Sequence, residues 1–304
     1  MERRDFLKTM GVGAASMAVG GNLLASHSGG TGTAIEAEAL PSIGLISGSG
    51  GNWHRDGSRA GLKKIAEWGY TEMEFGGGIR GMEADEWPSY LQSLGLKPMI
   101  GSAGMAVLLD EEKLKTTIET SLKQGKEYLA CYWPWLDENK QDSIDGWKEV
   151  ADHLNIGGAV CKREGITLIF HNHDMEFYPV EGQIPFDVMM SNLDPAVGIE
   201  LDLYWIYKSG VSVEEYLQKY PGRYPVLHVK DIPADIKLGT GRTVFGDLTE
   251  NDFTCVGCGS IDFASIFKLN SISGAKHFMV EADKPGNVAT FLELSAKYLR
   301  ELRF

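Results

Sequence analysis

Residues 166–178 read ITLIFHNHDMEFY, and the interpretation of the whole chain starts from this stretch. The apolar run Ile166–Phe170 predicts a short strand that is buried on both faces. Side chains alternate along a strand, so His171 and His173 point to the same side. Two imidazoles at the end of a buried strand, with two carboxylates just beyond, favour a divalent-metal or acid–base site over a surface turn.

Short apolar runs alternate with amphipathic runs from residue 43 to the end of the chain. Eight strand–helix units predict a parallel sheet that closes into a (β/α)8 TIM barrel, an α/β fold. We expect strands at residues 43–47, 71–75, 97–100, 128–133, 166–171, 197–202, 226–230 and 277–281. We expect helices at residues 57–68, 84–94, 111–125, 142–164, 186–191, 213–219, 261–269 and 287–301. An open doubly wound sheet is the alternative, but no GxGxxG or Walker A pattern supports a nucleotide site.

The N-terminus carries a predicted export signal. Residues 3–8, RRDFLK, match a twin-arginine pattern, and a Gly- and Ala-rich apolar stretch follows at about residues 10–25. That stretch is too weakly hydrophobic for a stable membrane span, and AEA at residues 37–39 matches a small-x-small cleavage site. We expect a signal peptide at residues 1–39, a single barrel domain at residues 40–304, and a periplasmic or extracytoplasmic location. A cytoplasmic tail or an uncleaved anchor is the alternative.

Composition excludes some partners. The chain has 29 basic and 42 acidic residues, a net charge of −13, which disfavours binding to a nucleic-acid backbone. The 265 residues after the leader fit one barrel, and none of their stretches is apolar enough for a membrane span. A homo-oligomer is compatible with the sequence.

The four cysteines give no metal or redox motif. Cys255 and Cys258 have CxxC spacing, but no second pair completes a zinc site. An oxidising compartment permits a disulfide between them, yet the sequence favours reduced side chains. Cys131 and Cys161 fall on a predicted strand and a predicted helix, and we expect both to be buried apolar residues.

Four consecutive predicted strands end in metal-type ligands. Strand 5 ends in His171, strand 6 in Asp202 and strand 8 in Glu281, while strand 7 carries His228 and then Lys230. Active sites of such barrels lie at the C-terminal ends of the strands, so these side chains meet there. One metal site explains all of them together, whereas separate structural roles, such as helix capping by Asp202 or Glu281, must be assigned one by one.

These strand ends resemble a known family. The matching pieces are HNHDMEF at 171–177, LDLYW at 201–205, LHVKD at 227–231, VGCGSIDF at 256–263 and MVEAD at 279–283. Over residues 43–301 the chain resembles the sugar phosphate isomerase/epimerase superfamily of xylose-isomerase-like barrels. The resemblance implies one divalent cation, with manganese favoured over zinc or magnesium, held by Glu, Asp, His and Glu from strands 5 to 8.

Carried over by position, the implied metal ligands are His171, Asp202, His228 and Glu281. His171 replaces the usual Glu, because the chain resembles a subgroup with an HNHDxEF motif. His173 is the alternative strand-5 ligand, and Glu176 is a candidate to replace the missing carboxylate. His171 ranks first because it ends the strand in the register of the usual Glu.

The resemblance implies a metal-dependent isomerase or epimerase that acts on a keto-sugar or sugar derivative. A cation polarises the carbonyl, a base among His173, Glu176 and Glu281 removes the neighbouring proton, and an enediolate forms. Lys230 is expected to stabilise the oxyanion or to protonate a leaving group. With a leaving group β to the carbonyl, the same enediolate makes the protein a lyase. A non-catalytic, exported sugar-binding barrel is the alternative from another class.

The expected substrate is a small, unphosphorylated carbohydrate, because the sequence shows no phosphate cradle and sugar phosphates are scarce outside the cytoplasm. The related apurinic endonucleases are disfavoured, since Trp205 stands where they have His. Residues 232–259 are expected to form a long loop over the mouth of the barrel. Four aromatic residues are expected either to stack on a sugar face or to pack: Trp53, Trp133, Trp135 and Tyr204.

Overall fold

The computed structural model describes residues 37–49, 59–75, 79, 82–83 and 85–304. Nearly all of the predicted leader, and also Trp53, therefore lie outside the described residues. The described chain starts at Ala37, and Glu38 pairs with the last residue through two backbone hydrogen bonds. Glu38 N donates to Phe304 O at 2.9 Å, and Phe304 N donates to Glu38 O at 3.1 Å.

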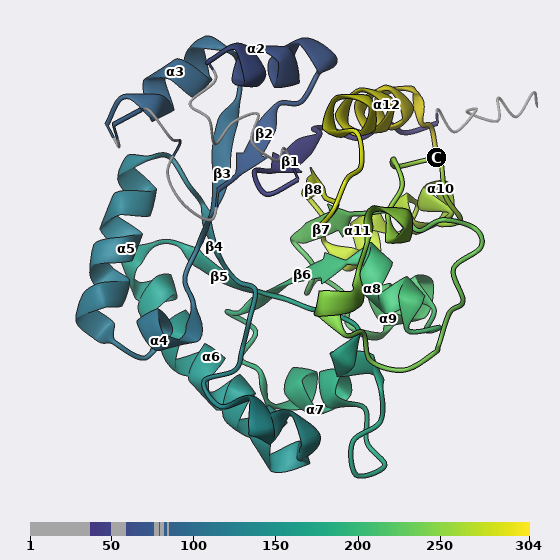
Figure 1. Ribbon diagram of the computed structural model, residues 1–304. Coiled ribbons are helices and arrows are strands. Elements are labelled where there is room, and N and C mark those ends of the chain that lie inside the picture. The colour runs from purple at the N-terminus through teal and green to yellow at the C-terminus, as the bar shows by residue number, and fades with distance from the viewer. Residues whose placement is uncertain (1–36, 50–58, 76–78, 80–81, 84) are drawn as a thin grey trace, which may run out of the picture. The chain divides into compact units, whose positions relative to one another are not determined.

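The predicted barrel fold is confirmed. Eight parallel strands close into a barrel in sequence order, with the first strand paired to the last (Figure 1). The strands are β1 (Gly44–Ile46), β2 (Glu72–Glu74), β3 (Lys97–Ser102), β4 (Tyr128–Cys131), β5 (Thr167–His171), β6 (Gly198–Asp202), β7 (Val226–Val229) and β8 (His277–Val280). Most of their residues are buried, because helices cover the outer face and side chains fill the inside.

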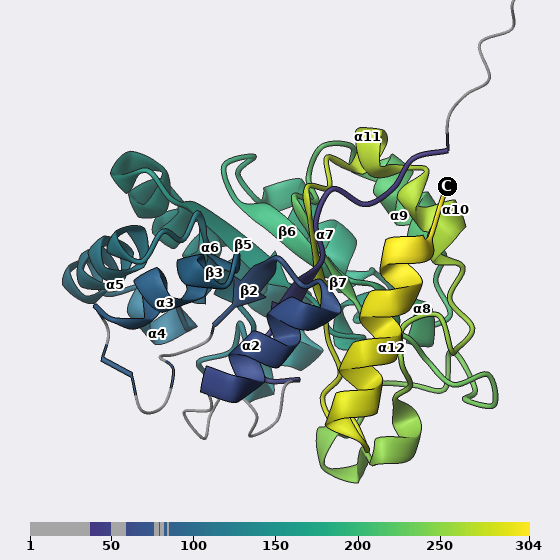
Figure 2. The ribbon, with the colours of Figure 1, turned by 90° about the horizontal axis from the view of Figure 1, so that it is seen from above.

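Helices surround the strands. Those described are α2 (Arg59–Trp68), α3 (Trp87–Ser93), α4 (Met105–Leu108), α5 (Glu111–Lys123), α6 (Ile144–Glu164), α7 (Pro185–Asn192), α8 (Leu203–Lys208), α9 (Val213–Lys219), α10 (Phe263–Phe267), α11 (Asn270–Ser273) and α12 (Val288–Glu301). Helix α12 packs beside α2 and so completes the ring around the barrel (Figures 1 and 2). Across the described residues, no helix has the length and apolar character that a membrane span needs.

Local sequence signals account for the best-predicted helices. Asp110 caps α5 by accepting a hydrogen bond from Lys113 N, as expected of an N-cap residue. Ser143 caps α6 in the same way, and Gly165 ends that helix with a left-handed φ of 87°. The sequence did not predict α4 or α8. Strand β4 ends at Cys131 rather than at residue 133, and β7 ends one residue before Lys230.

Alternation along the strands separates the barrel interior from its outer face. In β7 and just beyond it, Val226, His228 and Lys230 share one side. An apolar cluster includes Val226, Ile169 and Met279, each two residues before a side chain of the polar layer described next. The inside of the barrel therefore changes from apolar to charged toward the C-terminal ends of the strands.

Candidate metal centre

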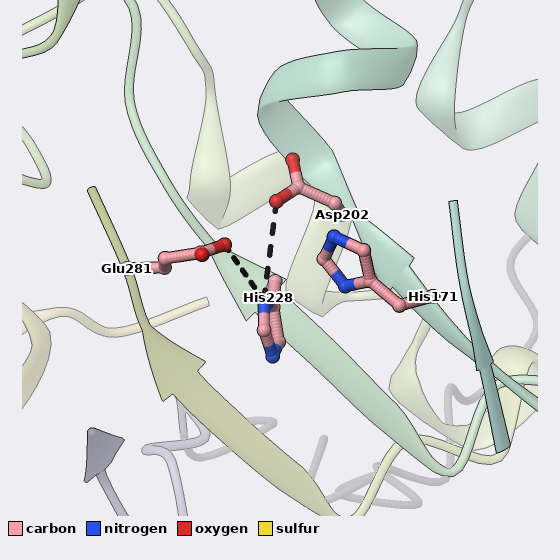
Figure 3. Close-up of side chains that lie close together, drawn as sticks. All are labelled: His171, Asp202, His228 and Glu281. Atoms are coloured by element: carbon pink, nitrogen blue, oxygen red, sulfur yellow. Dashed lines mark hydrogen bonds and ion pairs between the residues drawn. The ribbon is translucent and has the colours of Figure 1, made fainter. Parts of the chain in front are cut away.

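Four predicted ligands come together at the C-terminal ends of β5 to β8 (Figure 3). Each offers one ligand atom, and these atoms all lie within 4.8 Å of one another: His171, Asp202, His228 and Glu281. Parallel pairing brings them level, since Asp202 is in register with His228 across β6 and β7. Imidazole and carboxylate donors are ligands of Zn²⁺ and Mn²⁺.

Asp202 both caps a helix and faces the centre. Its Oδ1 accepts a hydrogen bond from Trp205 N at 2.9 Å, which caps α8. Its Oδ2 is buried and accepts no hydrogen bond from the described residues, but it lies 3.3 Å from Lys230 Nζ. Capping and metal binding are therefore compatible, because each uses a different oxygen.

His228 lies between two sets of carboxylates. Its Nδ1 is 2.8 Å from Glu281 Oε2, toward the mouth of the barrel. Its Nε2 is 2.9 Å from Glu74 Oε2 and 3.2 Å from Glu200 Oε1. Burial opposes a charged imidazole, but Glu200, Glu74 and Glu281 outweigh it and raise the pKa of His228 well above its usual value.

Sequence reasoning missed Glu74 and Glu200, which are fully buried. Glu74 accepts a hydrogen bond from the Tyr132 hydroxyl, and Glu200 Oε2 lies 3.3 Å from His171 Nδ1. The sequence did contain a signal for them, because each is a charged residue within a short buried strand. Glu200, for example, lies two positions before Asp202 in the same strand.

The buried charges do not balance, and this imbalance fits a cation. Five carboxylates gather around the centre. Glu74, Glu200 and Asp202 are fully buried, whereas Glu281 is partly buried and Asp283 is exposed. Lys230 and His228 supply two positive charges against them, whereas burial holds the pKa of His171 well below its usual value. Burial also raises the pKa of Asp202 to about 7 and of Glu200 to about 8. A divalent cation would offset this surplus of negative charge.

Lys230 is a buried cation at the rim of the four-residue group. Its Nζ lies 2.7 Å from Asp283 Oδ2, 3.0 Å from Glu281 Oε2 and 3.3 Å from Asp202 Oδ2. Burial opposes its charge, but these carboxylates raise the pKa of Lys230 well above its usual value. Lys230 therefore holds its proton and contributes a fixed positive charge.

His173 and Glu176 lie beside the four-residue group rather than in it. The His173 ring contacts those of His171 and Phe245, with centroids 4.9 and 5.1 Å apart, and its Nδ1 accepts no hydrogen bond from described residues. Burial lowers the pKa of His173 to about 3, so the ring is neutral. Glu176 Oε2 accepts a hydrogen bond from His173 N at 3.0 Å, and burial raises the pKa of Glu176 to about 8.

The aromatic candidates divide between the mouth and the core. Trp133 is half-buried and contacts the rings of His173 and Phe245, with centroids 5.7 and 5.9 Å apart. Phe245 belongs to the long segment after β7, so that segment reaches the mouth as predicted. Trp135 packs against Trp147 of α6, with ring centroids 4.6 Å apart, and is therefore a core residue.

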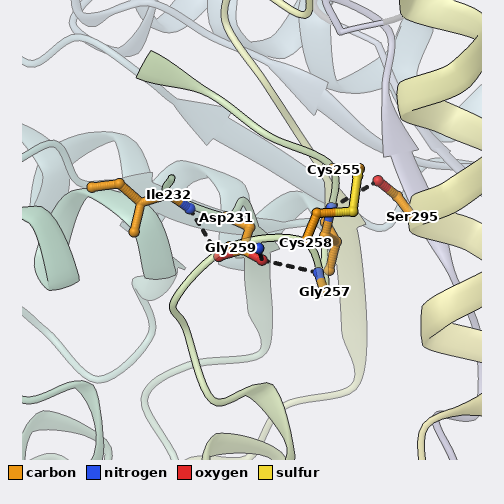
Figure 4. Close-up of a disulfide and its surroundings, with 8 residues drawn as sticks. Asp231, Ile232, Cys255, Gly257, Cys258, Gly259 and Ser295 are labelled. Atoms are coloured by element: carbon orange, nitrogen blue, oxygen red, sulfur yellow. Dashed lines mark hydrogen bonds between the residues drawn. A yellow bond between two sulfur atoms is a disulfide. The ribbon is translucent and has the colours of Figure 1, made fainter. Parts of the chain in front are cut away.

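The segment after β7 is held by Asp231, and it contains a disulfide (Figure 4). The Asp231 carboxylate accepts hydrogen bonds from four backbone N–H groups, those of Ile232, Gly257, Gly259 and Ile261. Cys255 and Cys258 form a disulfide with Cα atoms 5.3 Å apart, so the expectation of reduced side chains was wrong. The turn around Asp231 brings the two cysteines together, and spacing alone does not reveal that turn. Cys131 and Cys161 are buried and free, as predicted.

Fold and site together define the class of this protein. Residues 62–302 match the family model of the xylose isomerase-like TIM barrel, and the chain belongs to this family. An inosose dehydratase from Clostridium beijerinckii is 28% identical over 212 residues, which cover 66% of this chain and 65% of that relative. The match therefore spans just under two thirds of the relative's length.

Solved structures show the same architecture. A sugar phosphate isomerase/epimerase from Parabacteroides distasonis is 26% identical, with a TM-score of 0.70 over 86% of this chain and 98% of that chain. A 3-keto-D-glucoside 4-epimerase from E. coli is 15% identical, with a TM-score of 0.59 over 86% of this chain and 99% of that chain. The second likeness shows the fold alone.

Proposed function

We propose that this protein is a metal-dependent enzyme that removes a proton next to the carbonyl of an oxidised sugar or cyclic polyol. The observation that carries this proposal is the gathering of two imidazoles and two carboxylates at the barrel mouth, inside a surplus of buried negative charge. One divalent cation, with manganese favoured, would be held by His171, Asp202, His228 and Glu281. When bound, it would supply Lewis-acid polarisation of the substrate carbonyl.

The chain's own residues supply the proton chemistry. His173 is the first candidate for the base, because its ring packs beside that of His171 and its Nδ1 accepts no hydrogen bond from the described residues. Glu176 supports the backbone of His173 and is a second candidate, since its Oε1 accepts no hydrogen bond from described residues. Lys230 places a fixed positive charge beside the centre, where it would stabilise a developing oxyanion.

Two outcomes share this first step. Return of the proton gives an isomerase or epimerase, and loss of a group β to the carbonyl gives a lyase. The relative named inosose dehydratase has a name that denotes an elimination. The structure named 3-keto-D-glucoside 4-epimerase has a name that denotes return of the proton. We propose the proton abstraction for this chain and leave both outcomes to the assay.

An unphosphorylated substrate is proposed with it. Three of the described basic residues, Lys230, Lys208 and Arg242, each lie beside a carboxylate. Their charges are therefore already partnered rather than free for a phosphate. Turnover of phosphorylated sugars only would contradict this part of the proposal.

Solvent deuterium exchange tests the proposed function directly. The purified protein is incubated with a keto-sugar or inosose in D2O, with Mn²⁺ or with a chelator, and deuterium at the carbon next to the carbonyl is measured by NMR. Metal-dependent incorporation supports the enzyme. Tight sugar binding with no exchange supports instead the alternative, a non-catalytic sugar-binding barrel.

We also propose export by the twin-arginine route. The support is the RRDFLK pattern at residues 3–8 and the apolar stretch after it. The disulfide between Cys255 and Cys258 is of the kind that persists in an oxidising compartment. Replacing Arg3 and Arg4 together by Lys is expected to retain the protein in the cytoplasm, as measured by cell fractionation. Unchanged export of this variant would contradict the proposal.

A further inference from the structure

The two nitrogens of His228 face opposite groups. Nδ1 is directed to Glu281 Oε2 at 2.8 Å, within the proposed ligand set (Figure 3). Nε2 is directed to Glu74 Oε2 at 2.9 Å, one layer deeper in the barrel. The imidazole and Glu74 are fully buried, whereas Glu281 is partly exposed at the mouth of the barrel.

Glu74 is itself held in place. It is the last residue of β2 and fully buried, and its other oxygen, Oε1, accepts a hydrogen bond from the Tyr132 hydroxyl. Tyr132 lies directly after β4, so three different parts of the barrel contribute to the chain of contacts Tyr132, Glu74 and His228. A carboxylate fixed at one oxygen can orient an imidazole through the other.

We propose that Glu74, held by Tyr132, is a positioning residue that fixes which nitrogen of His228 binds the metal. A neutral imidazole has one N–H donor and one acceptor nitrogen, and the partner of one nitrogen decides the role of the other. In the metal-free protein the charged His228 ring donates from both nitrogens, Nδ1–H to Glu281 and Nε2–H to Glu74. A bound cation would replace the proton on Nδ1, and the contact of Nε2–H with Glu74 would leave Nδ1, which faces Glu281 and Asp202, as the ligand atom. This inference rests on the proposed metal centre and adds Glu74, which lies outside the group of His171, Asp202, His228 and Glu281.

Glu200 assists but does not replace Glu74. Glu200 Oε1 is 3.2 Å from His228 Nε2, farther than Glu74, and its Oε2 lies 3.3 Å from His171 Nδ1. Neither oxygen of Glu200 makes a hydrogen bond of good geometry with the described residues. Glu74 therefore has the shorter and better-supported contact to the imidazole.

The barrel offers a matched control at its other end. Glu72, two residues before Glu74 on β2, contacts His277 Nδ1 at 3.0 Å through its Oε2. This pair has the same chemistry and is likewise largely buried, but neither member belongs to the four-residue group. Replacing Glu72 therefore removes a buried carboxylate–imidazole contact without touching the proposed ligands.

Metal titration tests the inference. Wild type, Glu74→Gln, Tyr132→Phe and Glu72→Gln are stripped of metal and titrated with Mn²⁺ by calorimetry. Loss of such an outer partner typically weakens metal binding about 10- to 100-fold. We expect a loss of that size for Glu74→Gln, a smaller loss for Tyr132→Phe, and unchanged affinity for Glu72→Gln. Tyr132→Phe keeps the test valid if Glu74→Gln fails to fold.

A spectroscopic readout separates positioning from general stability. In the Co²⁺-substituted protein, the Nε2–H proton of a bound His228 gives a paramagnetically shifted, exchangeable signal, and Glu74→Gln is expected to speed its exchange with water. Wild-type affinity and unchanged exchange in Glu74→Gln would overturn the inference. So would two Mn²⁺ ions in wild type with one lost in Glu74→Gln, because Glu74 would then be a ligand itself. A wild type that binds no Mn²⁺ would contradict the proposed metal centre as well.

Discussion

The two ends of the barrel interior contain the same pair of side chains and differ in what surrounds it. At the N-terminal end, Glu72 contacts His277 at 3.0 Å, and these two groups satisfy one another. At the C-terminal end, Glu74 contacts His228 at 2.9 Å, but Glu200 and Glu281 approach the same imidazole. At the N-terminal end one carboxylate contacts the imidazole of His277, whereas at the C-terminal end three carboxylates contact the imidazole of His228.

This difference distinguishes a structural polar pair from a binding site. A buried carboxylate is stable when it has a hydrogen-bonding partner, and Glu72 has one in His277. The upper layer has carboxylate oxygens that accept no hydrogen bond from the described residues, such as Asp202 Oδ2, and carboxyl groups whose pKa values burial raises. A fold that retains such an uncompensated layer is expected to bind a cation there.

Replacing the shared imidazole should have the largest effect. In His228→Asn, Mn²⁺ binding is expected to be lost, and metal-dependent deuterium exchange should fall about 10³-fold or more, about 4 kcal/mol of transition-state stabilisation. His277→Asn is the matched variant from the lower pair, and it should keep Mn²⁺ affinity while losing some thermal stability. Equal effects of the two substitutions on metal binding would remove the distinction between the two ends.

Removing the charge of Lys230 should have the next largest effect. Lys230→Met leaves three neighbouring carboxylates without their cation, and breaking a buried ion pair costs about 3–5 kcal/mol of folding stability. The loss should be largest in the metal-free protein and smaller with Mn²⁺, as measured by denaturant unfolding. Exchange activity should fall about 10²-fold. Full activity in this variant would exclude the proposed role in oxyanion stabilisation.

The folding stability of the metal-free protein should fall as the pH rises from 6.5 to 8. Burial raises the pKa of Glu176 and Glu200 to about 8 and of Asp202 to about 7, far above the value near 4 in an unfolded chain. Between pH 6.5 and 8 the folded protein therefore holds protons that the unfolded chain has lost, and its stability falls as pH rises. The raised pKa of His228 acts in the same direction. The lowered pKa values of His171 and His173 act in the opposite direction, but mainly near pH 6.5, where the unfolded histidines are still partly protonated, and the four raised groups outnumber them.

The expected slope is up to about 1.4 kcal/mol per pH unit for each group. Mn²⁺ should flatten it, because a bound cation replaces protons on the ligands. Thermal unfolding at pH 6.5, 7.2 and 8, with and without Mn²⁺, measures both slopes. A metal-free protein that becomes more stable across this range would contradict the assigned pKa directions.

The disulfide should contribute the smallest effect. It closes a short loop between Cys255 and Cys258, so its removal is expected to cost about 2 kcal/mol of stability. The double variant Cys255→Ser, Cys258→Ser should bind Mn²⁺ like wild type, because Asp231 still holds the loop through four backbone hydrogen bonds. A large loss of metal affinity would show that the disulfide supports the centre directly.

The sequence predicted the barrel and the four-residue group for one physical reason. The C-terminal ends of parallel strands lie at the same end of the barrel. A polar residue that follows an apolar run, such as His171 or Asp202, is therefore expected there. Glu74 and Glu200 lie within strands, where pattern alone does not tell an inward carboxylate from an edge residue. Helix α8 was missed because its apolar residues resemble a strand, and only the Asp202 cap marks its start.

The disulfide was missed for a different reason. Its geometry depends on Asp231, 24 residues before Cys255, through contacts that no local spacing encodes. The sequence ranked His171 first of three strand-5 candidates by its register, and the distances place His171 in the group of four while His173 and Glu176 lie outside it. Long-range contacts of this kind are what the structure added.

A crystal structure of the Mn²⁺-loaded protein with a keto-sugar, recorded at the manganese absorption edge, tests the central claim most directly. One anomalous peak among His171, Asp202, His228 and Glu281, with the sugar carbonyl beside it and none near Glu72 and His277, is the predicted result. No peak within the group of four, or a peak only at the lower pair, would contradict the account.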